Sequence, residues 1–389
     1  MLKSLPPVGN PIQLASHIAP EVVFSDVFTS NEVYLYDSGT MALAAALVAI
    51  REYRSVSSPE VLLPAYACPD LISAVLYAGL TPVLVDLVPD RPWMDLGKLR
   101  QLIGPNTVAV IAAHFLGLPE HLQDIRSVLD GTDVMLVEDS AQLFPRSRTD
   151  AVWQGDMVVL SFGRGKPVSL LGGGAVISRH SSLATLLPEG VAARLESTLG
   201  LAPNWKFKLK VRAYNALLSP LGYGALKHAP FLHLGATVYK PLQRISPFDK
   251  ERVAMLATNI IAYQQTNRQV QVWISEMLNA TAEDLILDLP SVAAVPSTVP
   301  LLRYPVLFKD QYRRDRVHDA LSRAGLGASK MYESPLPQIE GLGNILSEGD
   351  GYPTATNFSK RLLTLPCHLS VQQQHVEKMK GIWESLLYR

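Results

Sequence analysis

The chain has 389 residues, of which 48% are apolar and 18% charged, so it can bury a sizeable core and is not disordered. Lys plus Arg and Asp plus Glu each total 35, so the composition gives no sign of a broad basic surface for nucleic acid. The two cysteines, Cys68 and Cys367, lie far apart, which excludes a disulfide framework and a cysteine zinc site. Without a secretory signal or a long apolar run, we expect a cytoplasmic protein that holds no metal.

Between residues 38 and 187 the chain alternates helix-like and strand-like segments. Helices are expected from Ser38 to about Tyr53, from Pro69 to Ala78 and from Leu122 to Leu129. Short strands are expected at residues 60–64, 82–86, 108–114, 134–139, 157–162 and 174–178. Because these strands are apolar throughout and interleaved with helices, we predict an α/β fold with a mostly parallel sheet covered by helices on both faces.

Residues about 190–248 differ in character from the rest of the chain. The segment WKFKLKVRAYNALLSPLGYGALKHAPFLHLG is basic, aromatic and interrupted by Pro and Gly. One interpretation of residues 205–240 is a helix that lies on a membrane surface. We favour the other, an irregular helical insertion that packs near a functional site or a partner subunit.

The remaining residues are expected to form a second, smaller unit. One long helix is predicted from Asp249 past Val272, followed by a strand at 302–308, a helix at 310–324 and a strand at 361–365. Ser370 and Gln373 have the spacing of a capping box for a final helix to about Leu387. The predicted units are a large domain of residues 1–248, which includes the insertion, and a C-terminal α+β domain of residues 249–389.

The segment SFGRGK, residues 161–166, places one lysine among glycines after a predicted strand. It is not a Walker loop, because Leu160 and Pro167 stand where that motif needs Gly and Ser or Thr. It is not a dinucleotide fingerprint either, because residue 168 is Val instead of the third glycine. Taken alone, Lys166 could equally be a lysine in a solvated turn.

Three further segments give Lys166 a chemical context. Small polar residues at 37–40 start a helix and leave N–H groups that suit a phosphate dianion, although they could simply cap the helix. Asp139 ends an apolar strand at the sheet edge where parallel sheets bind ligands, although it could cap the following turn. Ser161 ends the next strand and could bind the same phosphate.

A phosphate cradle, a carboxylate and a lysine on a loop after a strand are together the parts that pyridoxal 5′-phosphate requires. Its aldehyde forms a Schiff base with a lysine amine, and its pyridinium nitrogen needs an anionic partner. Its phosphate needs N–H and hydroxyl donors. These residue types therefore predict a site for this cofactor.

The order of these segments resembles the DegT/DnrJ/EryC1/StrS family of fold-type-I pyridoxal-phosphate enzymes, which are mostly sugar aminotransferases. The resemblance is carried by SGTMALAAAL at 38, VLLPAYACPDLISAVLYAGLTPVLVDL at 61, HFLGLP at 114, VEDSAQ at 137, SFGRGK at 161, GGGAVIS at 172 and RLLTLPCHLSV at 361. It implies a seven-stranded, mostly parallel sheet and a homodimer. It also implies transfer of an amino group from an amino acid, with glutamate as the expected donor, to a nucleotide-linked keto sugar.

The resemblance also implies roles for individual residues. Lys166 would form the Schiff base and move the proton, and Asp139 would pair with the pyridinium nitrogen. Gln142 would lie near the ring hydroxyl, and Tyr332 falls where the family's C-terminal unit places a tyrosine near substrate. The phosphate would be bound by Gly39, Thr40 and Ser161.

The chain departs from the family's pattern beside several of these residues. Cys68 stands where the family has an aromatic residue on the cofactor ring, which leaves a redox role or a small buried filler as interpretations. Residues 244–248 replace the Asn-Tyr-Arg segment that reaches the neighbouring subunit's site. Arg164 either binds an anionic group of the substrate or faces solvent. His114 either contacts the cofactor ring or is a core histidine bonded to backbone.

Two other functions stay open. Some relatives are sugar dehydratases with histidine in place of the lysine, and Lys166 argues against that chemistry. The presence of Lys166 and Asp139 argues against a non-catalytic regulator or scaffold, whereas Cys68 at the cofactor-stacking position keeps that alternative open.

Overall fold

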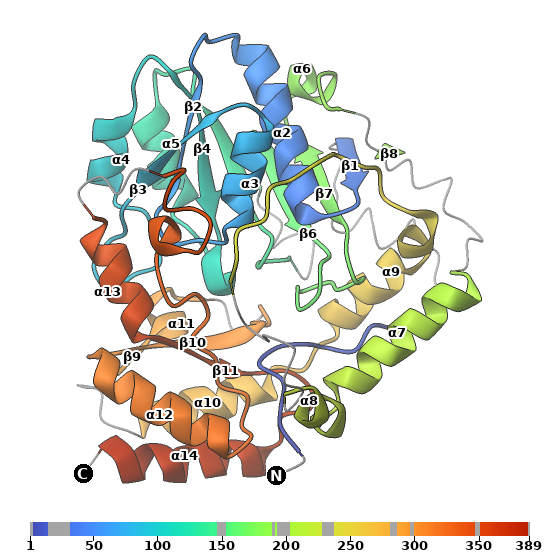
Figure 1. Ribbon diagram of the computed structural model, residues 1–389, viewed down its shortest axis with the longest axis vertical. Coiled ribbons are helices and arrows are strands. Elements are labelled where there is room, and N and C mark those ends of the chain that lie inside the picture. Colours follow the sequence, from blue (N-terminus) through green and yellow to red (C-terminus); the bar gives the residue numbers. More distant parts are fainter. Residues whose placement is uncertain are drawn as a thin grey trace.

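The computed structural model describes residues 3–14, 32–145, 153–188, 191–192, 203–227, 237–280, 286–295, 299–346 and 351–387. A large sheet with its helices lies above a small sheet with its own helices in the view of Figure 1. The chain enters the large sheet first and reaches the small one only after residue 280.

The large sheet contains eight strands in the order β3-β2-β4-β5-β6-β7-β1-β8. The five strands from β3 to β6 pair in parallel, whereas β7, β1 and β8 are antiparallel additions at one edge. In chain order the strands are β1 (Glu32–Tyr36), β2 (Glu60–Pro64), β3 (Thr81–Val85), β4 (Thr107–Ala113), β5 (Met135–Asp139), β6 (Met157–Ser161), β7 (Gly174–Ser178) and the two-residue β8 (Val191–Ala192). The predicted α/β fold is confirmed, and β1, which the sequence did not predict, completes the seven longer strands.

Helices cover both faces of this sheet because successive strand residues point to opposite sides. Leu63 and Ile111 share a buried cluster with α2 (Gly39–Arg54) and α3 (Asp70–Tyr77). On the opposite face, Leu62 and Val110 share a cluster with α4 (Leu96–Leu102) and α5 (Leu122–Leu129). Leu160 on that face packs instead with α9 (Lys250–Gln264).

The small unit is built on the antiparallel sheet β11-β10-β9, against which α12 and α13 pack. Its helix α14 packs against α10 and α12. The elements are α10 (Gln269–Asn279), β9 (Ile286–Asp288), α11 (Leu289–Val292), β10 (Arg303–Phe308), α12 (Gln311–Arg323), α13 (Pro353–Arg361), β11 (Leu362–Pro366) and α14 (Gln373–Leu387). The short helical turns elsewhere are η1 (Phe115–Gly117), α6 (Ser181–Ala184) and η3 (Leu336–Gln338).

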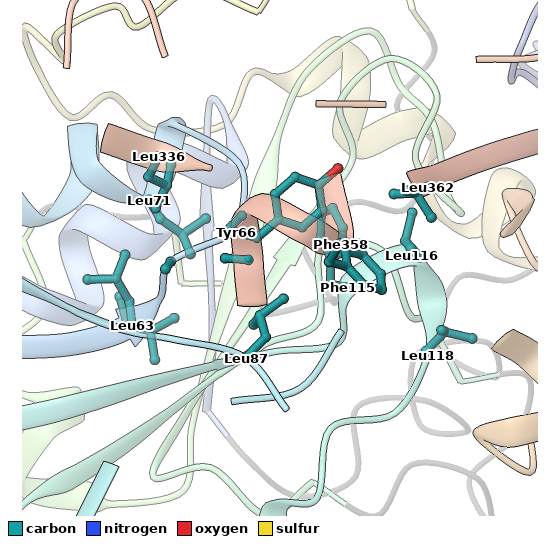
Figure 2. Close-up of a cluster of buried hydrophobic side chains, with 14 of the residues drawn as sticks. Leu63, Tyr66, Leu71, Leu87, Phe115, Leu116, Leu118, Leu336, Phe358 and Leu362 are labelled. Atoms are coloured by element: carbon teal, nitrogen blue, oxygen red, sulfur yellow. The ribbon is translucent and has the colours of Figure 1, made fainter. Parts of the chain in front are cut away.

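An apolar cluster joins the two units (Figure 2). Leu63 and Tyr66 of the large unit meet Leu336 and Phe358 of the tail in this cluster. The ring centroids of Tyr66 and Phe358 lie 5.5 Å apart in an edge-on contact, a geometry that aromatic pairs favour. The domain boundary at residue 248 stays a prediction. The helix that follows it, α9, packs against residues of the large sheet such as Leu160.

The single long helix predicted from Asp249 past Val272 is wrong, because α9 ends at Gln264 and α10 begins at Gln269. Thr266 Oγ1 donates to the carbonyl of Ala262 at 3.1 Å, and Asn267 Oδ1 accepts from the N–H of Gln269 at 2.8 Å. Such side-chain bonds compete with the helix ladder and interrupt it.

The capping box predicted at Ser370 and Gln373 is also wrong, because α14 begins at Gln373 itself. The residue before the helix, Gln372, donates its backbone N–H to His375 Nδ1 at 3.0 Å. In a capping box, the side chain three residues after the cap accepts from the cap's backbone N–H. Here His375 accepts in this way from Gln372, two residues later than the predicted pair Ser370 and Gln373.

Of the predicted insertion at about 190–248, the structure describes α7 (Trp205–Leu218), α8 (Pro220–Lys227), β8 and residues 203–204 and 237–248. Its residues 190, 193–202 and 228–236 lie outside the described part of the chain. α7 packs against α8 and runs along the right-hand side of the molecule in Figure 1.

Candidate active site

A cavity of about 270 Å³ opens where β5 and β6 end, beside the start of α2. Strands that pair in parallel bring their carboxyl ends to one edge, which is why residues distant in sequence meet here. The predicted site residues that line this cavity are Gly39, Thr40, Cys68, Asp139, Gln142, Ser161, Arg164 and Lys166. Tyr332 and His114 lie beside it, as described below.

The start of α2 offers this cavity free backbone donors. Ser38 caps the helix, since its Oγ accepts from the N–H of Met41 at 3.1 Å. The N–H groups of Gly39 and Thr40 belong to the first turn, where amides have no acceptor within the helix. The positive end of the helix dipole lies at the same place, so an anion such as a phosphate suits it.

Gly39 allows the helix start to press against Ser161. A Cβ at residue 39 would lie 2.7 Å from both Cβ and Oγ of Ser161, which is closer than real Cβ contacts. Ser161 Oγ accepts from the N–H of Gly163 at 3.4 Å and retains its own proton for a ligand. These residues form a cradle that any side chain at residue 39 would fill.

Asp70 is a cavity residue that the sequence analysis missed. Thr40 Oγ1 donates to Asp70 Oδ2 at 3.2 Å, so Thr40 presents its backbone N–H to the cavity while its hydroxyl proton is used. The only signal in the sequence was an acidic residue at a helix start two positions after Cys68. Its carboxylate places a negative charge near the start of α2, so binding of a phosphate there depends more strongly on the hydrogen-bond donors of Ser161 and α2.

Lys166 lies on the loop between β6 and β7. The loop is closed by two backbone hydrogen bonds of 2.8 Å, from the N–H of Phe162 to the carbonyl of Gly173 and from that of Leu170 to the carbonyl of Phe162. Gly173 has φ +101°, and a Cβ there would lie 2.1 Å from the ring of Phe248. Phe248, the last residue of segment 244–248, also packs against Phe162 with ring centroids 6.1 Å apart, so this segment supports the start of the lysine loop.

Asp139 is the buried acid of the site, with 9% of its surface exposed. Its Oδ1 accepts from the N–H of Ala141 at 3.0 Å. Burial raises the pKa of this carboxyl, and the Ala141 N–H and the charge of Lys166 only partly oppose that effect. A protonated ring nitrogen would give the carboxylate the partner that it lacks, so Asp139 fits the pyridinium of pyridoxal phosphate.

Cys68 and Tyr332 form a polar contact at the cavity wall. Burial raises the pKa of the Cys68 thiol to about 11 and that of Tyr332 well above its usual range, and the two side chains hydrogen-bond. Tyr332 is held from the large unit by the hydroxyl of Tyr66, which donates to its carbonyl at 2.7 Å. A thiol with a raised pKa is a poor nucleophile, which favours the small-filler interpretation of Cys68.

His114 borders a smaller cavity that shares Cys68, Asp139 and Gln142 with the main one. Its Nδ1 accepts from the N–H of Glu120 at 2.9 Å, so its Nε2 carries the proton and donates to Glu138 Oε1 at 3.1 Å. Both ring nitrogens are therefore used by the protein, which favours the core interpretation. Glu138, which the sequence analysis did not single out, orients this imidazole behind Asp139.

Arg252 is a second residue that the sequence analysis missed. Its guanidinium pairs with the carboxylate of Asp37 and lies 3.2 Å from Asp249 Oδ2. These contacts tie the residue that precedes the cap of α2 to the start of α9. The pair unites segments far apart in sequence, and nothing local in the sequence indicates it.

A sequence profile of the DegT/DnrJ/EryC1/StrS aminotransferase family matches residues 21–195, which contain all the cavity-lining residues predicted above. The chain is 22% identical over 365 residues to an Escherichia coli dTDP-4-amino-4,6-dideoxy-D-glucose transaminase, covering 90% of this chain and 84% of that protein. Over residues 21–195 the chain matches the DegT/DnrJ/EryC1/StrS aminotransferase family.

Other relatives of this aminotransferase agree with that assignment. An Acidithiobacillus ferrooxidans UDP-N-acetyl-3-dehydro-α-D-glucosamine 3-aminotransferase is 25% identical over 356 residues, covering 90% of this chain and 83% of that protein. The crystal structure of NtdA from Bacillus subtilis with bound cofactor PMP superposes with a TM-score of 0.67 at 17% identity, covering 97% of this chain and 79% of that one. The structural likeness establishes the shared fold.

The described residues contain no group of three or more His, Cys, Asp and Glu side chains placed to hold a metal ion. Within the same part of the chain, no helix is both long and apolar enough to cross a membrane.

Proposed function

We propose that this aminotransferase uses pyridoxal 5′-phosphate to move an amino group from an amino acid, with glutamate the expected donor, to the keto group of a nucleotide-linked sugar. The observation that carries the cofactor assignment is the shared cavity of Lys166, Asp139 and the start of α2. Family membership supports the reaction class, and the relatives named above act on dTDP- and UDP-linked sugars. Cofactor and transaminase chemistry also agree with the PMP-bound structural relative.

Each residue of the cavity has a defined task in this proposal. When bound, pyridoxal phosphate supplies an aldehyde that takes up the amino group and a ring that accepts electrons. Lys166 Nζ would be the amine that holds the aldehyde, and its basicity would let it carry a proton away from and back to the donor and acceptor carbons. The Asp139 carboxylate would keep the ring nitrogen protonated, while Ser161 and the first N–H groups of α2 would bind the phosphate.

Arg164, at the mouth of the same cavity, is the residue that we assign to the anionic groups of the substrates. It is exposed and forms no ion pair with another described residue, so its guanidinium is available to a carboxylate or a diphosphate. Tyr332 of the C-terminal unit hydrogen-bonds the cavity residue Cys68, and we place the sugar on that side of the cavity.

A direct test mixes the purified protein and pyridoxal phosphate with glutamate and a panel of nucleotide-linked keto sugars, and detects amino-sugar products by mass. The proposal predicts a product that contains nitrogen from labelled glutamate. A protein that holds the cofactor but transfers nitrogen to none of the panel would refute the substrate assignment. A protein that binds no cofactor would instead support the regulator or scaffold alternative.

The location and assembly of the protein are part of the same proposal. We propose that it acts in the cytoplasm, where nucleotide-linked sugars and amino-acid donors are available, and that it is a homodimer, because the family's sites lie at a dimer interface. Sedimentation velocity at micromolar concentration tests the dimer, since a stable monomer with full activity would refute it.

A further inference from the structure

The chain has a long segment without acidic residues, although its overall charge is zero. From Ser197 to Phe248 the sequence contains no Asp or Glu. The cations of this segment are Lys206, Lys208, Lys210, Arg212, Lys227, Lys240 and Arg244. Neither the catalytic proposal nor the fold requires this concentration of positive charge.

α7 carries much of this charge beside exposed apolar side chains. Trp205 and Leu209 are 68% and 57% exposed, and Leu217 and Leu221 extend the same run toward α8 at 43% and 58%. An amphipathic helix normally turns such residues inward, yet Val211 is the buried position of α7. The Trp and Leu side chains therefore face away from the protein core.

The exposed apolar residues of α7 lie on one side of the helix. Trp205, Leu209, Ala213 and Ala216 fall on one face at the 3.6-residue repeat, with Leu217 at the margin of that face. The basic side chains of Lys206, Lys210 and Arg212 are exposed along the same face or its edges. Lys206 Nζ lies over the Trp205 ring at 5.8 Å, so charge and apolar surface are adjacent.

The described residues do not neutralise the cations of α7. Across the described residues, no salt bridge involves Lys206, Lys208, Lys210 or Arg212. Glu251 accepts from the capping residue Asn204 at 2.8 Å, so this acid lies at the end of the helix. An external anionic partner would find these charges available.

We propose that the exposed face of α7 and the start of α8 docks the enzyme on an anionic lipid bilayer. A helix with aromatic and leucine side chains beside lysines binds membranes by burying the apolar side chains among headgroups while the lysines attract anionic lipid. Charge complementarity favours this occupant over a second copy of the chain, because a two-fold contact would bring these unneutralised cations together. The docking is peripheral, and the residues that line the catalytic cavity take no part in it.

The test uses full-length protein loaded with cofactor and sedimented with vesicles of phosphatidylcholine, with or without phosphatidylglycerol. Binding is expected only to the anionic vesicles and is expected to fall at high salt. Trp205→Ser and Leu209→Ser should each weaken binding about tenfold, from the lost apolar transfer. Lys210→Gln should weaken it about fivefold.

Matched variants on other helices are the controls. Tyr312→Ser removes an aromatic side chain of α12 that is 69% exposed, and Lys380→Gln removes a lysine of α14; both should bind vesicles as the parent does. Equal binding to neutral and anionic vesicles, or unchanged binding by the α7 variants, would overturn the proposal. So would dissociation of the oligomer by Trp205→Ser in sedimentation velocity, because the face would then be a subunit interface.

Discussion

Replacement of Gly39 by alanine tests the phosphate cradle in the most local way. The added methyl would lie 2.7 Å from Cβ and Oγ of Ser161 and 3.3 Å from its Cα. Overpacking of this kind costs about 1–3 kcal/mol, and here the strain falls on the two segments that hold the phosphate. If the strain is relieved by moving them apart, cofactor affinity should fall about 5- to 150-fold.

The assay is titration of the apoprotein with pyridoxal phosphate, read by the absorbance of the bound cofactor, beside thermal unfolding. Gly381→Ala is the matched control, because a Cβ there meets nothing within 4 Å and alanine favours a helix interior by about 1 kcal/mol. It should bind cofactor normally and unfold no earlier than the parent. Gly39→Ala with parental cofactor affinity would refute the cradle.

A double variant separates crowding from loss of the hydroxyl. Ser161→Gly removes both atoms that the new methyl would strike, so Gly39→Ala with Ser161→Gly should bind cofactor about as well as Ser161→Gly alone. Additive losses would mean that the two residues act independently.

Three further predictions follow from individual contacts. Asp139→Asn should fold and bind cofactor but lower kcat about 100- to 1,000-fold, and a near-normal rate would remove this carboxylate from the mechanism. Because burial raises the pKa of Cys68 to about 11, its alkylation in the native apoprotein should be slow at pH 8 and rise about tenfold per pH unit, and fast labelling at neutral pH would contradict this. Asp86 accepts from Lys98 and from the start of α13, so Asp86→Ala should cost about 2–3 kcal/mol in urea unfolding. Burial alone would raise the pKa of Asp86, but these hydrogen-bond donors outweigh it and lower the pKa. The contribution of Asp86 to the free energy of unfolding is therefore full above its pKa in the unfolded chain and is lost as the pH falls below about 4. If the parent and Asp86→Ala lost stability in parallel in that range, the assignment would be contradicted.

The strands and the central cavity could be predicted from sequence because their signals are local. Apolar runs marked most of the strands, and Asp139 and Ser161 could be placed at the same sheet edge because each ends a parallel strand. β1 was missed, although its sequence, EVYLY, is rich in residues that favour strands, and it joins the sheet through antiparallel pairing with β7.

The contacts that support the site could not be predicted, because they join distant segments. Arg252 meets Asp37 across 215 positions of sequence, and Asp86 meets Ala355 across 269. The break between α9 and α10, residues 265–268, contains no Pro or Gly, and the side-chain bonds of Thr266 and Asn267 that interrupt the helix become evident only in the fold. Local patterns thus indicated the residues that we propose to perform the chemistry, and the fold revealed the residues that contact and support them.

The bond between Lys166 and the cofactor is the central claim, and borohydride trapping tests it most directly. Reduction of the protein loaded with pyridoxal phosphate makes that bond permanent, and peptide mass mapping then identifies the modified residue. We predict a single modified peptide that contains Lys166, and none in Lys166→Ala. Modification of another lysine, or unchanged labelling of the variant, would contradict the account.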